Sequence, residues 1–231
     1  MIDADVPTAL SGRRLLVLLA LTALPVVATR AVYQLAPPPS LASLRPPYVP
    51  FLVYALANWV TFALVVAVAG RPALRSSGLR LRLSLWRVAS ACAGFVAGVT
   101  IYGLVSAQLQ RWHLPPVGGM DFVDPTRLEI ASLVGSAVVS AAFCEEVFFR
   151  VLWIGALRRH VPLAAAVTVS VVAFAAIHFP HFGIGGSIFI IVWSVVPVVL
   201  FLTSGDCSSS VLMHMMNNTF AYIVVPLLLH P

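Results

Sequence analysis

The feature that most constrains this chain is a pair of adjacent carboxylates, Glu145 and Glu146, followed four residues later by Arg150. The surrounding stretch, 130–157, is otherwise uncharged and mostly apolar. An ionised side chain at the centre of a hydrocarbon layer costs at least ~2.5–3.5 kcal/mol, so such residues face the interior of a helix bundle and need partners there. This stretch is therefore the first candidate functional site, and its partners must lie on other helices.

The composition is that of a helical membrane protein. Hydrophobic residues make up 60% of the 231 residues and charged residues only 10%, whereas a soluble domain carries roughly 25% charged residues. The apolar runs are continuous and do not alternate with a period of two, which argues against a barrel. We therefore predict an all-α fold, a polytopic transmembrane helix bundle.

Hydropathy divides the chain into about seven expected spans. Arg13 and Arg14 precede the first run, as in a signal peptide, but no good cleavage site follows, so an uncleaved first span is favoured. We expect residues 1–127 to hold spans one to three and a basic cytoplasmic loop, and residues 128–231 to form a catalytic core with spans four to seven. The spans cover about 15–29, 51–69, 88–109, 128–158, 162–178, 184–202 and 208–229.

The positive charge is concentrated in short connections. All 14 basic residues are arginines, and seven of them lie in the loop 70–87 and at Arg158 and Arg159. This is the positive-inside pattern, so both clusters are expected in the cytoplasm, with the N-terminus inside and the C-terminus outside. It argues against nucleic acid as a partner and for the lipid bilayer. The Leu/Arg alternation over 79–85 indicates a segment on the membrane surface. The lack of lysine indicates a GC-rich genome, and we expect a multi-pass protein of a bacterial inner membrane.

Two later spans carry the polar partners. His178 lies near the end of the fifth span, and His214 and Asn218 lie four residues apart on one face of the seventh. At 1.5 Å per residue from the cytoplasmic ends, Glu145 lies ~20 Å deep, His178 ~24 Å, His214 ~14 Å and Asn218 ~20 Å. The four side chains are therefore expected at a similar level in the bundle.

Helical geometry separates the two glutamates. Glu146 and Arg150 are spaced i, i+4 and can pair, whereas Glu145 points about 100° away and is free to face a cavity. Cys144 is interpreted as a small buried hydrophobe rather than a nucleophile. The remaining histidines are expected in solvated loops or ends and the methionines of the seventh span in bundle packing: His113, His160, His181, His230, Met213, Met215 and Met216.

This set of side chains suits amide hydrolysis. A glutamate in a dry site can act as a general base on water that an imidazole holds, and a second imidazole with an amide N–H can stabilise an oxyanion. The alternative is zinc, bound by two histidines and a carboxylate with one position open for water. Asn218 is a poor zinc ligand and no H-E-x-x-H motif is present, so chemistry without a cofactor is favoured and zinc remains the alternative.

Three motifs, in order on successive polar spans, resemble the CPBP (CAAX protease and bacteriocin-processing, or Abi) family, which includes type II CAAX prenyl endopeptidases. They are E-E-x-x-x-R at 145–150, F-x-x-x-H at 174–178 and H-x-x-x-N at 214–218, and the resemblance covers about 128–225. It implies an intramembrane endopeptidase acting on a peptide or protein in or at the membrane. In that reading Glu145 and His178 activate water, His214 and Asn218 form the oxyanion site, and Glu146, Arg150 and Phe174 support them.

Two other functions remain open. In a proton-coupled transporter, Glu145 and His178 would relay protons, but the internal repeats and interrupted half-helices typical of transporters are absent from the sequence pattern. A non-catalytic immunity or scaffold protein would bind a partner in the membrane with the same residues. Peptide cleavage that depends on Glu145 separates the peptidase from both.

Overall fold

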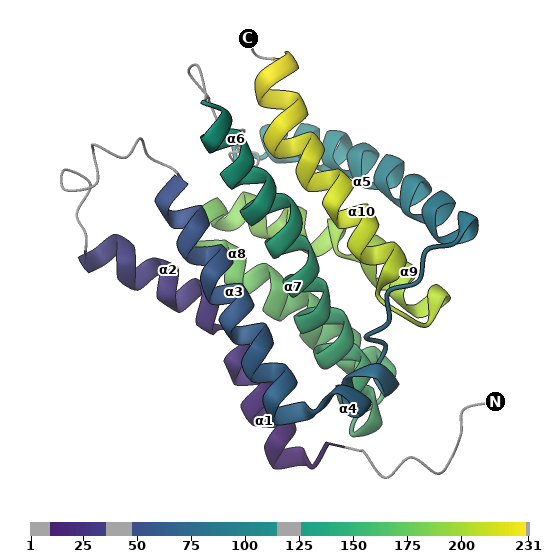
Figure 1. Ribbon diagram of the computed structural model, residues 1–231. Helices are drawn as coiled ribbons and strands as arrows, with labels where there is room; N and C mark the ends of the chain where they lie inside the picture. Colours follow the sequence, from purple (N-terminus) through teal and green to yellow (C-terminus); the bar gives the residue numbers. More distant parts are fainter. Residues whose placement is uncertain (1–9, 36–47, 115–125, 230–231) are drawn as a thin grey trace.

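The structure is a computed structural model that describes residues 10–35, 48–114 and 126–229. All regular secondary structure in these ranges is helical, which confirms the predicted all-α class (Figure 1). In the first half the helices are α1 (Gly12–Leu21), α2 (Leu24–Leu35), α3 (Tyr48–Ala69), α4 (Arg71–Ser76) and α5 (Leu85–Arg111). In the second half they are α6 (Arg127–Leu133), η2 (Val134–Ala141), α7 (Ala142–Glu146), η3 (Val147–Ala156), η4 (Leu157–Arg159), α8 (Leu163–Trp193), α9 (Val195–Ser204), α10 (Ser208–Thr219) and η5 (Phe220–Leu229).

The number of membrane spans differs from the prediction. Four stretches in the described ranges are long and apolar enough to cross a membrane: Gly12–Val32, Phe51–Ala69, Leu85–Arg111 and Leu163–Ser204. They contain the expected spans one, two and three, and the fifth and sixth together. The segments expected as spans four and seven are helical but are not among these four stretches, so a count of seven is not confirmed. These two segments carry the buried residues Glu145, Glu146, Arg150, His214 and Asn218.

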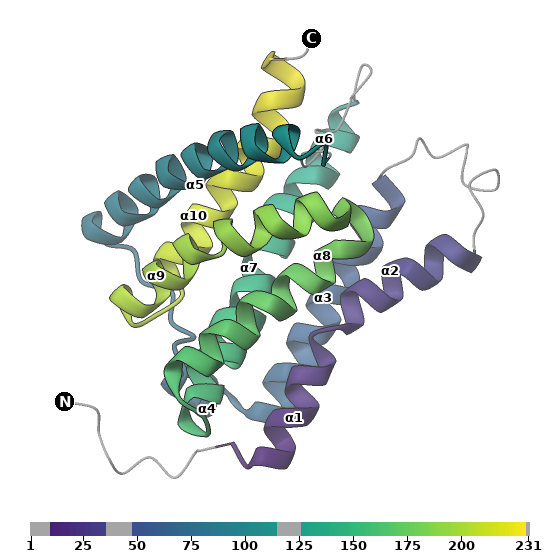
Figure 2. The same cartoon turned by 180° about the vertical axis from the view of Figure 1, so that it is seen from behind.

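The segment 179–183, which was expected to turn the chain between spans five and six, changes the direction of the chain only at its last residue, inside α8. Residues 179–182 continue the helix, and the backbone departs from it at Gly183, with φ 63° and ψ −162°. That region of backbone space is essentially restricted to glycine. Figure 2 shows the two parts of α8 bent relative to each other.

The helix from α6 to η4 is the centre of the bundle. It begins with a capping box in which Thr126 and Glu129 satisfy each other's backbone N–H groups. Its middle section, α7, contacts α3 on one side and α10 on another, while η3 packs against α8 and α1 (Figure 1). Two π-helical segments, η2 and η3, flank α7. π-Helical turns occur frequently at functional sites. The position of the two glutamates between two such segments is therefore typical of a functional site.

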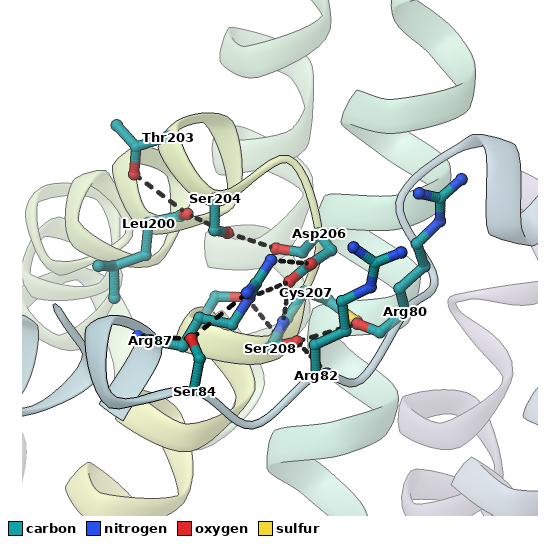
Figure 3. A network of polar contacts seen from close by, with 11 residues as sticks. Arg80, Arg82, Ser84, Arg87, Leu200, Thr203, Ser204, Asp206, Cys207 and Ser208 are labelled. Carbon is teal, nitrogen blue, oxygen red and sulfur yellow. Dashed lines mark hydrogen bonds and ion pairs between the residues drawn. The ribbon is translucent and has the colours of Figure 1, made fainter. Parts of the chain in front are cut away.

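The arginine-rich loop before α5 is tied to the turn between α9 and α10 (Figure 3). The backbone N–H of Arg82 donates to the Ser208 hydroxyl at 2.7 Å, and that hydroxyl donates to the Arg80 carbonyl at 3.1 Å. Arg87 pairs with Asp206 at 2.7 Å. The first half of the chain thus braces the start of α10, the helix that carries His214. The division at residue 127 into two domains, and the placement of the loop on the membrane surface, stay predictions.

The Arg87–Asp206 pair makes stability depend on pH. Burial by itself raises the pKa of a carboxyl, but hydrogen bonds from Arg87 and Ser208 outweigh it and hold the pKa of Asp206 below its ordinary value. The folded pKa is therefore lower than the unfolded pKa of about 3.9, so the stabilisation is present above that pH and is lost as pH falls through the folded pKa.

We expect Asp206→Asn to lower the free energy of unfolding at pH 7 by roughly 1.5–3 kcal/mol, the range for hydrogen bonds to charged groups. Thermal unfolding in detergent checks this, and the difference from wild type should shrink below about pH 4. Arg87→Gln should cause a similar loss, and the double variant should lose little more, because both changes remove one interaction. A difference that does not change with pH would contradict this account.

Candidate active site

The four side chains predicted to act together line one cavity of about 370 Å³. Glu145 comes from α7, His178 from α8, and His214 and Asn218 from α10. The structure therefore brings together all four residues that the helical spacing placed at a similar depth. Aromatic and aliphatic side chains make most of the remaining wall, among them Phe51, Phe174, Ile177, Phe189, Ile190 and Trp193.

A buried charge cluster lies beside this cavity. Glu146 pairs with Arg150 through Oε2 and Nε at 3.3 Å, and both side chains are fully buried. The predicted i, i+4 pair is thus confirmed. The other carboxylate oxygen of Glu146 accepts a hydrogen bond from His214 Nδ1 at 3.0 Å, a contact that the sequence did not predict. Glu146 therefore joins α7, η3 and α10 and is not among the residues that line the cavity.

Phe174 supports the same cluster. The Arg150 guanidinium carbon lies 5.1 Å from the centre of the Phe174 ring, a geometry in which the ring face attracts the cation. Phe174 also lies edge-on to the rings of His178 and His214, at centroid distances of 4.6 and 6.3 Å. This one aromatic side chain separates the Glu146–Arg150 pair from the cavity and fixes the walls around both imidazoles.

Within residues 10–35, 48–114 and 126–229, no arginine forms an ion pair with Glu145. Its Oε1 accepts a hydrogen bond of 2.8 Å from the hydroxyl of Tyr54 on α3, and its Oε2 lies 3.7 Å from His214 Nε2. Tyr54 was missed at the level of sequence because its span reads as uniformly apolar. The signal that could have found it is the spacing of Tyr54, Asn58 and Thr61, three polar side chains on one helical face of that span.

The rings of the two cavity histidines are oriented by contacts of their Nδ1 atoms. His178 Nδ1 lies 2.7 Å from the Phe174 carbonyl, and His214 Nδ1 lies 3.0 Å from the Glu146 carboxylate. Both partners only accept hydrogen bonds, so each Nδ1 must carry a proton. The Nε2 atoms are left for chemistry in the cavity.

Asn218 is anchored by the neighbouring helix. Its Nδ2 donates to the Ala137 carbonyl of η2 at 2.8 Å, and its Oδ1 accepts from Asn217 at 3.4 Å. An amide nitrogen has two N–H groups, so one anchors the side chain to η2 and the second is available to a ligand in the cavity. This arrangement fits a rigid oxyanion donor.

One of the peripheral histidines was misplaced by the sequence analysis. His181 lies within α8, not in a loop, and lines the same cavity. The helix includes Pro180, and its backbone becomes non-helical only at Gly183. His113 and His160 lie in exposed turns, as expected, and His230 lies outside the described residues. Cys144 and Met213 are fully buried in the core, as predicted, and Met215 and Met216 pack against it.

The arrangement of donors does not fit zinc. A catalytic zinc site needs three protein ligands converging at about 2.0–2.3 Å. No group of three or more His, Cys, Asp or Glu side chains in the described ranges is arranged to hold a metal ion. The Nδ1 atom of His214 is hydrogen-bonded to Glu146, and the Asn218 amide is hydrogen-bonded to the Ala137 carbonyl.

Residues 127–220 match the family described as type II CAAX prenyl endopeptidase Rce1-like. The match confirms the resemblance predicted from the three motifs, and the description of that family indicates a peptidase that works at a membrane. The four predicted site residues that line the cavity lie inside the matched segment, while Tyr54 lies outside it. No curated protein matches the chain, and no solved structure does.

We expect Arg150→Ala to lower the free energy of unfolding by roughly 3–5 kcal/mol, because Glu146 would keep a buried charge without its partner. Arg158→Ala is the matched control, since Arg158 is exposed near the end of the same helix. The measurement is thermal unfolding of both variants in detergent, with the yield of folded protein. Unchanged stability of Arg150→Ala would show that the pair is not needed for folding.

Proposed function

We propose that this protein is an intramembrane endopeptidase that hydrolyses a peptide bond with water activated by Glu145 and His178, without a metal. The observation that carries the proposal is the unequal environment of two adjacent carboxylates. Glu146 is occupied by Arg150 and His214, whereas Glu145 lines the cavity with one oxygen near an imidazole. Such a division leaves one carboxylate for stability and one for proton transfer.

In the first step Glu145 takes a proton from a water molecule, and the resulting hydroxide attacks the scissile carbonyl carbon. His178 accepts a hydrogen bond from that water through Nε2, since its Nδ1 proton is committed to the Phe174 carbonyl. This orientation directs the oxygen lone pair of the water toward the substrate. Positioning of this kind is a large part of the barrier reduction available to an enzyme.

In the second step the tetrahedral oxyanion is stabilised by His214 and Asn218. Glu146 accepts the Nδ1–H of His214 and thereby orients the ring. In its doubly protonated form the ring donates Nε2–H to the oxyanion together with the second N–H of Asn218. Collapse of the intermediate breaks the C–N bond, and Glu145 returns its proton to the leaving amine. Water and one peptide bond are converted into a carboxylic acid and an amine, and Glu145 is again ionised.

The proposed substrate is a membrane-associated or prenylated peptide. The wall of the cavity is mainly apolar and aromatic, and such walls bind apolar groups through the burial of their surface. The family match, described in terms of CAAX prenyl endopeptidases, supports the same substrate class. We also propose that the protein resides in a bacterial inner membrane, on the basis of its composition and its apolar helices.

We expect purified protein in detergent or vesicles to cleave a prenylated C-terminal peptide, and Glu145→Gln to reduce kcat by at least about 10²-fold because the amide cannot accept the proton. Glu129→Gln is the control, since glutamine can replace glutamate in the capping box at the start of α6. Equal cleavage by wild type and Glu145→Gln, or by neither, would contradict the proposal.

The proposal also predicts that metal removal leaves activity intact. Prolonged incubation with phenanthroline should not lower kcat, and elemental analysis of active protein should show no stoichiometric zinc. Glu145→Asp should lose about 100-fold in activity, because a shortened side chain displaces the carboxylate by about 1 Å. Zinc at one equivalent that follows activity through purification would overturn the metal-free mechanism.

A further inference from the structure

The first half of the chain contributes one polar group directly to the predicted general base. The Tyr54 hydroxyl lies 2.8 Å from Glu145 Oε1, and both residues line the cavity. A carboxylate only accepts hydrogen bonds, so the phenol is the donor. Tyr54 lies on α3, outside the segment 127–220 that matches the family.

The backbone around Tyr54 is held against the central helix. The Ser140 hydroxyl of η2 donates to the carbonyl of Ala55, the residue next to Tyr54, at 3.3 Å. The ring of Trp59 on α3 also stacks on the ring of Phe143 on α7, at a centroid distance of 5.7 Å. These contacts place α3 in a defined register against η2 and α7, so the phenol reaches Glu145 from a fixed position.

We propose that Tyr54 is the positioning residue of the general base, a role that rests on the proposed peptidase function. Its O–H holds Oε1 of Glu145 and leaves Oε2 directed toward His214, whose Nε2 lies 3.7 Å away. The hydrogen bond to Tyr54 thus fixes the orientation of the Glu145 carboxylate. A single orientation presents one lone pair to the water that it must deprotonate.

A second tyrosine provides the matched comparison. Tyr222 on η5 also lines the cavity, and its ring lies 5.9 Å from that of Phe51. No hydrogen bond joins it to Glu145 in the part of the chain that the structure describes. Tyr54→Phe and Tyr222→Phe therefore remove the same atom from the same cavity, and only the first removes a contact with the carboxylate.

The kinetic test compares these two variants with wild type on the prenylated peptide. Tyr54→Phe should lower kcat about 10- to 100-fold, the loss expected for a hydrogen bond to a charged group, with KM near wild type. Tyr222→Phe should not show this selective loss of kcat. In a Glu145→Asp background, whose shorter side chain has already broken the contact, Tyr54→Phe should add at most about a threefold loss.

An infrared measurement tests the contact without activity. The difference spectrum between wild type and Glu145→Gln isolates the carboxylate stretch of Glu145, and Tyr54→Phe should shift this band while Tyr222→Phe should not. An unshifted band, an undiminished kcat, or independent losses for Tyr54→Phe and Glu145→Asp would each overturn the assignment. If wild type cleaves no peptide, the proposed function fails, and the infrared shift alone decides whether Tyr54 holds Glu145.

Discussion

The fold depends on the pairing of charge inside an apolar bundle. Glu146 lies between Arg150 and His214, and all three side chains are buried. A lone ion at this position would be expelled or would distort the packing, because its desolvation is not compensated. Contacts with Arg150 and His214 offset the desolvation of the Glu146 carboxylate. The contact with His214 also joins α10 to the central helix. The requirement to neutralise one buried glutamate thus sets the relation between the helices that carry the site.

The same pairing distinguishes two neighbours of identical chemistry. Adjacent positions on a helix face different directions, so Glu145 reaches the cavity while Glu146 reaches the charge cluster. Phe174 contacts Arg150 of the buried ion pair and also lines the cavity beside the two imidazoles.

The first half of the chain is more than a membrane anchor. The Tyr54 hydroxyl contacts the predicted general base, and the loop before α5 binds the turn that begins α10 through Ser208 and Asp206 (Figure 3). Both contacts join residues that are at least 91 positions apart in the chain. The site within 127–220 is consequently completed and braced by residues outside the segment that carries the family motifs.

The sequence alone determined what local periodicity encodes. Helical class, the Glu146–Arg150 pair and the shared level of the polar groups follow from 3.6 residues per turn and a rise of 1.5 Å. The break at Gly183, the contact of Tyr54 with Glu145 and the bridge from Glu146 to His214 were decided by the tertiary structure. Hydropathy ranks a residue by its own polarity, whereas these features depend on which helices pack together, in which register and at which angle.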